Sequence, residues 1–257
     1  MRYFFIEKSE AGRSTPKITG SDAKHIKNVL RLKPGDTIGL FDGEGVDYEA
    51  RIVSVFSGRV EVSVTRSYPS TAESPVHLTV AQAYLKDRKM DDLIRQVTEL
   101  GANQWIPFFA ERSVPRPDEK RLSARMKRWK KIAQEALKQC KRGRIMDICE
   151  PVSFEGALHL GQSCGLKIAF WERESRPINS VLSHDSGSHF GEIFVLLGPE
   201  GGFTQREIEK ARTAGFVTAA LGPRILRAGT ATLAACILVQ YLFGDMGQKN
   251  LDKPPNL

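Results

Sequence analysis

Residues 192–214 read EIFVLLGPEGGFTQREIEKARTA, and their pattern identifies the fold class of this half of the chain. An apolar run over Glu192–Leu197 predicts a strand that ends in a glycine-rich turn. Thr204 then stands where it can cap a helix over Gln205–Ala214. A strand, a tight turn and a helix in this order are typical of a βαβ unit, which implies a parallel sheet. The stretch therefore places the second half of the chain in the α/β class.

The same alternation extends from residue 76 towards the end of the chain. Parallel sheets of this kind are covered by helices on both faces, and their ligands lie in loops just past the carboxyl ends of the strands. We predict strands at Val76–Leu85, Trp105–Phe109, Leu166–Trp171, Glu192–Leu197 and Phe216–Leu221, and helices at Lys89–Leu100, Glu119–Cys140, Phe154–Leu160, Gln205–Ala214 and Ala231–Phe243.

The first 70 residues have a different character. Short β-rich runs alternate with turn signals such as Asp42–Gly45, and one short helix near Ile26 interrupts them. Several short strands around one helix indicate a small β-barrel. Two prolines enclose small polar residues between positions 69 and 75, as in a linker. The predicted organisation is a β-barrel domain over 1–68, a linker over 69–75 and an α/β domain over 76–257.

The composition excludes several classes of protein. With 41% apolar and 26% charged residues in 257, the chain is typical of a globular protein rather than a disordered or fibrous one. Lys and Arg number 38 against 30 Asp and Glu, and the net charge of +8 favours nucleic acid as a partner ahead of a membrane surface. No export signal or apolar run of ~18 residues is visible, so we expect a cytoplasmic protein. The four cysteines form no C-x-x-C pair, and we predict no metal.

The excess positive charge is concentrated in one segment. Arg116–Arg144 contains 12 Lys and Arg against 3 Asp and Glu, a local charge of +9. Apolar residues recur there at a spacing of three to four, so the basic side chains must project mainly from the other face of the predicted helix. A face of one sign favours phosphate contacts. A merely solvated basic face is the alternative.

Two loops of the α/β half open with the same tripeptide, Leu-Gly-Pro. Leu197–Phe203 follows one predicted strand, and Leu221–Thr230 follows the next. Glycines allow close approach of the backbone to a ligand, so two such loops favour a ligand pocket over two ordinary turns. The chain has no G-x-x-x-x-G-K-[ST] motif, no G-x-G-x-x-G after the first strand of this half and no G-x-S-x-G motif. Triphosphate, Rossmann dinucleotide and serine-hydrolase sites are therefore not expected.

Together these residues resemble the small-subunit ribosomal RNA uridine N3-methyltransferases of the SPOUT, or trefoil-knot, superfamily. The resemblance covers essentially the whole chain. Its most specific marks are LLGPEGGFTQREIE over 196–209 and LGPRILRAGTATLAA over 221–235. Further marks are Met1–Phe5, His25–Arg31, Lys33–Asp36, Lys86–Gly101, Phe109–Ser113 and the segment from Glu135 to Cys140.

The resemblance implies a PUA-like RNA-binding β-barrel followed by an α/β trefoil-knot methyltransferase domain that binds S-adenosylmethionine. Such proteins pair as homodimers near the cofactor sites. Carried onto this chain, the cofactor would be bound by Trp171, Leu197, Gly198, Pro199, Gly201, Gly202, Leu221, Gly222, Ile225, Leu226, Ala228, Gly229 and Thr230.

The implied activity is methylation of N3 of one uridine in small-subunit (16S) ribosomal RNA, in the decoding region. Uracil N3 carries a proton that must leave before or during the transfer. Glu200 or Glu172 could accept it, and Arg227 could stabilise the uracil oxyanion. For each carboxylate, a hydrogen bond that merely orients its loop is the alternative.

The substrate would be free small-subunit rRNA or the assembled small ribosomal subunit. A knotted methyltransferase for another base or for a ribose 2′-hydroxyl is one alternative. A non-catalytic RNA-binding assembly protein is another. The expected RNA contacts are Arg2, Lys24, His25, Lys27 and Arg31 in the barrel, and Arg121, Arg125, Arg128 and Lys131 in the basic helix.

Overall fold

The computed structural model describes residues 2–114, 116–178 and 191–247, which fall into two compact units. Unit 1 contains residues 2–73 and 137–145, and unit 2 contains residues 74–136, 146–178 and 191–247, apart from residue 115. The segment 137–145, placed by composition in the α/β domain, thus belongs to the first unit. The division of the chain at a linker over 69–75 remains a prediction.

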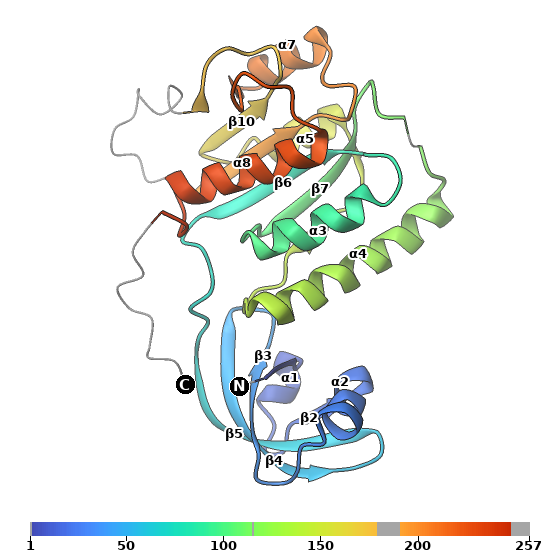
Figure 1. Ribbon diagram of the computed structural model, residues 1–257, viewed down its shortest axis with the longest axis vertical. Coiled ribbons are helices and arrows are strands. Elements are labelled where there is room, and N and C mark those ends of the chain that lie inside the picture. Colours follow the sequence, from blue (N-terminus) through green and yellow to red (C-terminus); the bar gives the residue numbers. More distant parts are fainter. Residues whose placement is uncertain (1, 115, 179–190, 248–257) are drawn as a thin grey trace. The chain divides into compact units, whose positions relative to one another are not determined.

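Unit 1 is built on a five-stranded sheet with strand order β1-β3-β4-β5-β2. The long pair β4 and β5 is antiparallel and contains two register shifts, which bend and twist the ribbon. Strand β5 runs to Pro69, which lies opposite Val46, so the strand continues into the residues expected to form the linker. The elements are β1 (Tyr3–Phe5), α1 (Lys8–Ala11), β2 (Lys17–Thr19), α2 (Gly20–Lys24), a π-helix (His25–Leu30), β3 (Thr37–Phe41), β4 (Val46–Val55) and β5 (Arg59–Pro69) (Figure 1).

The core of unit 1 lies between this sheet and the α2–π-helix segment. Ile26 on the π-helix is fully buried against Ile38, Leu40 and Val60 of the strands. The π-helix ends at Leu30 and is capped by Arg31, which adopts the left-handed conformation (φ 54°) that is uncommon for a residue with a side chain. Ile26 thus packs inward, whereas Lys24, His25 and Lys27, and also the apolar Val29, are exposed.

Unit 2 contains a seven-stranded sheet in which every pairing is parallel. Its strand order is β12-β10-β11-β6-β7-β8, with β9 beside β7. The elements are β6 (His77–Ala83), α3 (Lys89–Glu99), β7 (Gln104–Phe109), α4 (Glu119–Cys140, whose last turn belongs to unit 1), β8 (Asp147–Ile148), β9 (Val152–Ser153), α5 (Phe154–Leu160), β10 (Leu166–Phe170), β11 (Glu192–Leu197), α7 (Gln205–Thr213), β12 (Val217–Ala219) and α8 (Ala228–Leu242).

Helices cover both faces of this sheet (Figure 1). On one face, apolar side chains of α3, α4 and α8 pack against the strands, with Trp129 and Val97 fully buried. On the other, α5 and α7 pack with Phe194 and Phe203. Helix α7 begins with a capping box, in which Thr204 and Glu207 each bond to the other's backbone amide. The predicted α/β class is confirmed. None of the described helices is long and apolar enough to cross a membrane.

The predicted last helix is wrong at its start. Helix α8 begins at Ala228, not at Ala231, so Ala228–Thr230 form its first turn rather than the end of a loop. Glycine at position 229 disfavours a helix on propensity alone, and packing of the rest of α8 overrides that preference. The short strands β8 and β9 were not predicted, because two residues carry no periodicity. The predicted knot depends on the path of the whole chain, including residues outside the described ranges, and stays a prediction.

Candidate active site

A cavity of about 740 Å³ opens at the carboxyl ends of β10, β11 and β12. These three strands follow one another in the chain and lie side by side and parallel in the sheet, so the loops that follow them meet at one edge. The volume is that of a typical small-molecule site. The lining residues are Lys89, Phe170, Trp171, Glu172, the run from Leu197 to Phe203, Ala220, Leu221, Gly222 and the run from Arg224 to Ala231.

Every residue proposed from sequence to bind the cofactor or to take part in catalysis lines this one cavity. Sequence reasoning missed several others. Lys89 could have been found, because it follows β6, whose carboxyl end lies beside that of β11. The remaining missed residues, Phe170, Phe203, Ala220, Arg224 and Ala231, adjoin predicted ones in the chain.

The loop after β11 is shaped by glycine. Gly202 has φ 65°, a conformation that side-chain-bearing residues rarely adopt, and its amide donates to the carbonyl oxygen of Pro199 at 2.9 Å. Arg112 donates from Nη1 to the carbonyl oxygen of Gly201 at 2.8 Å. The backbone of this loop is thereby fixed against the cavity, with no side chain at Gly201 or Gly202 to stand between it and a ligand.

Glu200 is held by two donors that follow β6, one in the loop and one at the first residue of α3. Its Oε1 accepts from Lys89 Nζ at 2.7 Å and from the backbone amide of Lys86 at 3.2 Å. Desolvation, which raises the pKa of this carboxyl, is outweighed by these hydrogen bonds, and the pKa is lowered. Glu200 therefore ties the loop after β11 to the segment that follows β6.

Glu172 stands in a different environment. Its side chain is exposed and makes no hydrogen bond or ion pair with any described residue. A Cβ atom added to Gly202 would lie 2.6 Å from Glu172 Oε1, so the carboxylate folds directly over the glycine loop. Of the two carboxylates in the cavity, Glu172 is the one with both oxygens free of a partner among the described residues, whereas Glu200 has donors on Oε1.

The third wall of the cavity is the loop after β12 and the start of α8. Gly222 has φ 101° and open space around its missing side chain. Arg227 is the exposed N-cap of α8, and the amides of the first turn have no helical partner. Ile225 is 86% exposed, an unusual state for a large apolar residue, and it lines the same cavity. This wall combines apolar surface with backbone donors and a cation.

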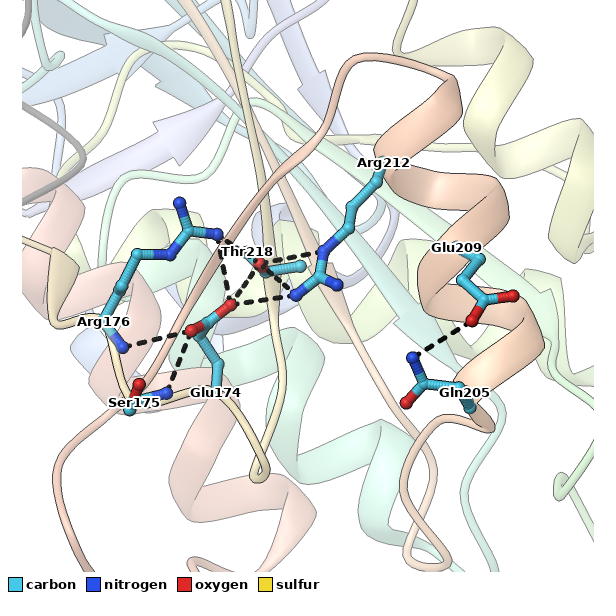
Figure 2. A network of polar contacts seen from close by, with 7 residues as sticks. All are labelled: Glu174, Ser175, Arg176, Gln205, Glu209, Arg212 and Thr218. Atoms are coloured by element: carbon cyan, nitrogen blue, oxygen red, sulfur yellow. Dashed lines mark hydrogen bonds and ion pairs between the residues drawn. The ribbon is translucent and has the colours of Figure 1, made fainter.

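The loop after β10, which carries Trp171 and Glu172 to the cavity, is anchored by the buried carboxylate of Glu174 (Figure 2). Thr218 Oγ1, Arg176 Nη2 and Arg212 Nη2 all donate to Glu174 Oε2. Desolvation opposes the charge, but the bonds from Thr218, Arg176 and the backbone outweigh it and lower the pKa of Glu174 to about 2. Arg212 also lies 5.8 Å from the ring of Trp171. The loop is therefore bound to β12 and α7.

The basic residues expected to bind RNA differ in their surroundings. In α4, Arg125 is half-buried and donates to Tyr84 Oη at 2.8 Å, while Arg128 pairs with Asp91 at 2.7 Å. Both arginines thus have structural partners. The exposed bases of α4 without a partner among the described residues include Lys127, Lys130 and Lys131, whereas Arg121 pairs with Asp118. In unit 1, Arg2, Lys24, His25, Lys27 and Arg31 are all exposed.

No cluster of three or more potential metal ligands exists among the described residues. The cysteines of this part of the chain are all free. The cavity is instead lined by backbone groups, apolar side chains, carboxylates and cations. These charged and backbone groups suit the charged parts of an organic ligand, and the apolar side chains suit an aromatic part.

Family models match both units. Residues 72–240 match an RNA methyltransferase domain, and residues 18–65 match an RNA methyltransferase PUA domain. A parallel sheet with a glycine-rich cavity at its strand ends, preceded by a PUA-like unit, is therefore the architecture of an RNA methyltransferase.

Relatives along the full length narrow the class. The ribosomal RNA small subunit methyltransferase E of Bacillus subtilis is 33% identical, over 94% of this chain and 96% of its own. The protein of the same name from Buchnera aphidicola (from Acyrthosiphon pisum) is 28% identical, over 89% of this chain and 88% of its own. A crystal structure of the Neisseria gonorrhoeae enzyme of that name, bound to S-adenosyl methionine, is 30% identical with a TM-score of 0.84, covering 96% of this chain and 99% of the other. The chain belongs to the ribosomal RNA small subunit methyltransferase E family.

Proposed function

We propose that the protein transfers the methyl group of S-adenosylmethionine to N3 of one uridine in the decoding region of small-subunit rRNA. The main support for this proposal is that the loops after three adjacent parallel strands converge on one cavity. Membership of the family supports the reaction class, and the donors around the cavity support the cofactor.

The cofactor would be held by the residues of all three loops. Apolar side chains such as Leu197, Leu221 and Leu226 suit its adenine ring, and the glycines at 201, 202 and 222 let backbone amides approach it. The free amides in the first turn of α8 suit its carboxylate, since helix N-termini favour negative charge. When bound, S-adenosylmethionine supplies a methyl group on a positively charged sulfur.

Glu172 is our candidate for the group that accepts the N3 proton. Its carboxylate lies over Gly202 at the cavity and has no partner among the described residues. Glu200 is disfavoured, because Lys89 and the Lys86 amide occupy it and lower its pKa. Arg227, exposed at the cavity, would stabilise the negative charge that develops on a uracil oxygen.

The RNA would be bound by exposed basic side chains of each unit. In unit 2 these are Lys127, Lys130 and Lys131 of α4, and in unit 1 they surround the π-helix and include Lys24, Lys27 and Arg31. Such contacts position a protein on RNA without reading its sequence, so selectivity for one uridine requires a folded RNA. The target base would be flipped towards the cavity at a cost of a few kcal/mol. The protein would act in the cytoplasm, where this RNA is assembled.

A second copy of the chain would cover the outer face of α8. Ile237 and Tyr241 of this helix are 45% and 62% exposed, although the helix is apolar on nearly every side. A helix of that composition is stable in water when another surface covers it. The first turn of α8 lines the cavity, so the pairing would lie close to the cofactor.

The activity is tested with purified protein, S-adenosylmethionine and either free small-subunit rRNA or small subunits from cells that lack the gene. Mass spectrometry of the nucleosides should show 3-methyluridine at one position. Methylation of another base or of a ribose hydroxyl would contradict the proposed acceptor atom. Cofactor binding without any methylation of either substrate would contradict the proposed substrate, and the absence of cofactor binding would favour a non-catalytic RNA-binding protein.

A further inference from the structure

Gln82 is a fully buried amide on β6, a strand whose other buried residues are mostly apolar. It lies near the carboxyl end of β6, opposite Leu197 of β11 on one side and Pro107 of β7 on the other. Its neighbours Ala81 and Ala83 are also buried. A buried amide is costly unless its hydrogen bonds are made, and an apolar residue would fill this position at lower cost. Packing alone therefore does not account for a glutamine at position 82.

The amide of Gln82 joins two walls of the cavity. Its Nε2 donates to the carbonyl oxygens of Gly198 and Ala83, each at 3.1 Å. Its Oε1 accepts from Thr232 Oγ1, and that hydroxyl also lies 2.8 Å from the carbonyl oxygen of Ala228. Carbonyl oxygens only accept, so the two contacts of Nε2 fix the orientation of the amide. The chain of contacts runs from Gly198 through Gln82 and Thr232 to Ala228.

In this series of contacts, Gly198 and Ala228 line the cavity, whereas Gln82 and Thr232 do not. Gly198 belongs to the loop after β11, and Ala228 begins α8. Gln82 and Thr232 are both fully buried beneath them. Gln82 thus lies behind the site, where it can set the distance between the loop after β11 and the first turn of α8 without touching a ligand.

We propose that Gln82, together with Thr232, is a positioning residue that holds the loop after β11 and the start of α8 in the arrangement that binds S-adenosylmethionine. This inference rests on the proposed function. Its loss should weaken cofactor binding more than it weakens the fold, because the sheet on both sides of β6 is held by its own backbone bonds. Binding of RNA should be unaffected.

The test compares pairs of variants that make the same chemical change at buried sites. Gln82→Met and Thr232→Val remove the side-chain contacts that join the loop after β11 to α8. Gln240→Met is the matched control, because Gln240 is as buried and bonds to Ser74 and to the Leu100 carbonyl, about 12 Å along α8 from Thr232. Thr98→Val is the second control, because Thr98 is fully buried and donates to the Ile94 carbonyl.

The readouts are the dissociation constant for S-adenosylmethionine by calorimetry, the KM for RNA and the midpoint of thermal unfolding. All four variants lose a buried hydrogen bond, so their midpoints should fall by similar amounts. Gln82→Met and Thr232→Val should weaken cofactor binding about tenfold, the scale of one buried bond. The controls should stay within about twofold, and Thr232→Ser should restore wild-type affinity.

A double variant distinguishes a relay from two separate effects. Gln82 and Thr232 act through each other. The double variant should therefore lose little more affinity than the single variant that shows the larger loss. Unchanged affinity in Gln82→Met, or equal losses in the controls, would overturn the inference. If Gln82→Met does not fold, Thr232→Val and Thr232→Ser decide the question. Failure of the wild-type protein to bind the cofactor would refute the proposed function itself.

Discussion

Gly202, in the loop that lines the cavity, has a positive φ that a residue with a branched side chain rarely adopts. Gly202→Val should abolish detectable binding of S-adenosylmethionine, because valine disfavours φ 65° and its side chain would displace the Glu172 carboxylate. The strain should cost about 1–3 kcal/mol of stability, and unfolding should stay cooperative. Calorimetry and thermal unfolding measure the two effects.

Gly215→Val is the matched control for this variant. Gly215 has φ 82° in the turn between α7 and β12, away from the cavity lining, and its added Cβ would meet only the flexible end of Lys167. It should lose similar stability and keep its affinity. Normal cofactor affinity in Gly202→Val would remove this loop from the site.

The two carboxylates of the cavity should respond differently to neutralisation. Glu172→Gln should lower the single-turnover rate by about 10²–10⁴-fold at saturating cofactor and RNA, as expected for loss of a general base. Glu200→Gln should mainly raise the KM for the cofactor, because it weakens the bond from Lys89 that holds the loop. If the rate of Glu172→Gln matches that of the wild type, the proton leaves by another route.

Glu174 should make stability depend on pH in a defined direction. Its folded pKa of about 2 lies below the ordinary value of 4.5, so the ionised form stabilises the fold fully above pH 4.5. That contribution declines as the pH falls below 4.5 and is lost as the pH passes through about 2. Glu174→Gln should therefore cost about 2 kcal/mol at pH 7, allowing for the partly exposed arginines, and less than half of that at pH 3.

Urea unfolding at the two pH values measures this difference. Glu209→Gln is the control, since Glu209 is exposed on α7 and bonds only to the Gln205 side chain in the network of Figure 2. Its substitution should change stability little at either pH. A cost for Glu174→Gln that is the same at pH 7 and pH 3 would contradict the assignment.

At the scale of elements, the basic face of α4 should contribute to RNA affinity through its unpaired lysines. Changing Lys127, Lys130 and Lys131 together to glutamine should flatten the slope of log affinity against log salt by about 2–3, since each phosphate contact contributes about 0.7–0.9. Cofactor affinity should not change. Filter binding across a salt series measures the slope.

Arg125→Gln and Arg128→Gln provide the comparison on the same helix. These arginines bond to Tyr84 and Asp91, so their loss should reduce stability more than it changes the salt slope. An unaltered slope in the triple lysine variant would mean that this face of α4 is only solvated.

For the whole molecule, the exposed apolar side chains of α8 lead us to expect a dimer. Ile237→Glu should convert a dimer into a monomer at micromolar concentration, because it places a charge in an apolar contact. Leu160→Glu is the control, since Leu160 at the end of α5 is equally exposed, at 45%. Sedimentation measures both. A wild-type monomer at this concentration would contradict the proposed pairing.

The sequence was informative where a local pattern has one structural meaning. Leu-Gly-Pro after two apolar strands predicted the cavity, because the carboxyl ends of parallel strands in one sheet lie along the same edge, and so do the loops that follow them. The ion pair of Lys89 with Glu200 and the bond of Gln82 to Gly198 could not be predicted. They join residues 111 and 116 positions apart, and no local periodicity records such contacts. The partners of Arg125 and Arg128 were missed for the same reason.

The strand order of unit 2 also bears on how the protein is made. Strand β10 lies between β11 and β12, both of which follow it in the chain, and the cavity needs loops from all three. During synthesis, a nascent chain that has reached only β11 has two walls of the cavity and lacks the third. Cofactor affinity therefore arises only after β12 and the start of α8 have left the exit tunnel and β12 has paired with β10, and pairing of strands distant in the chain slows folding.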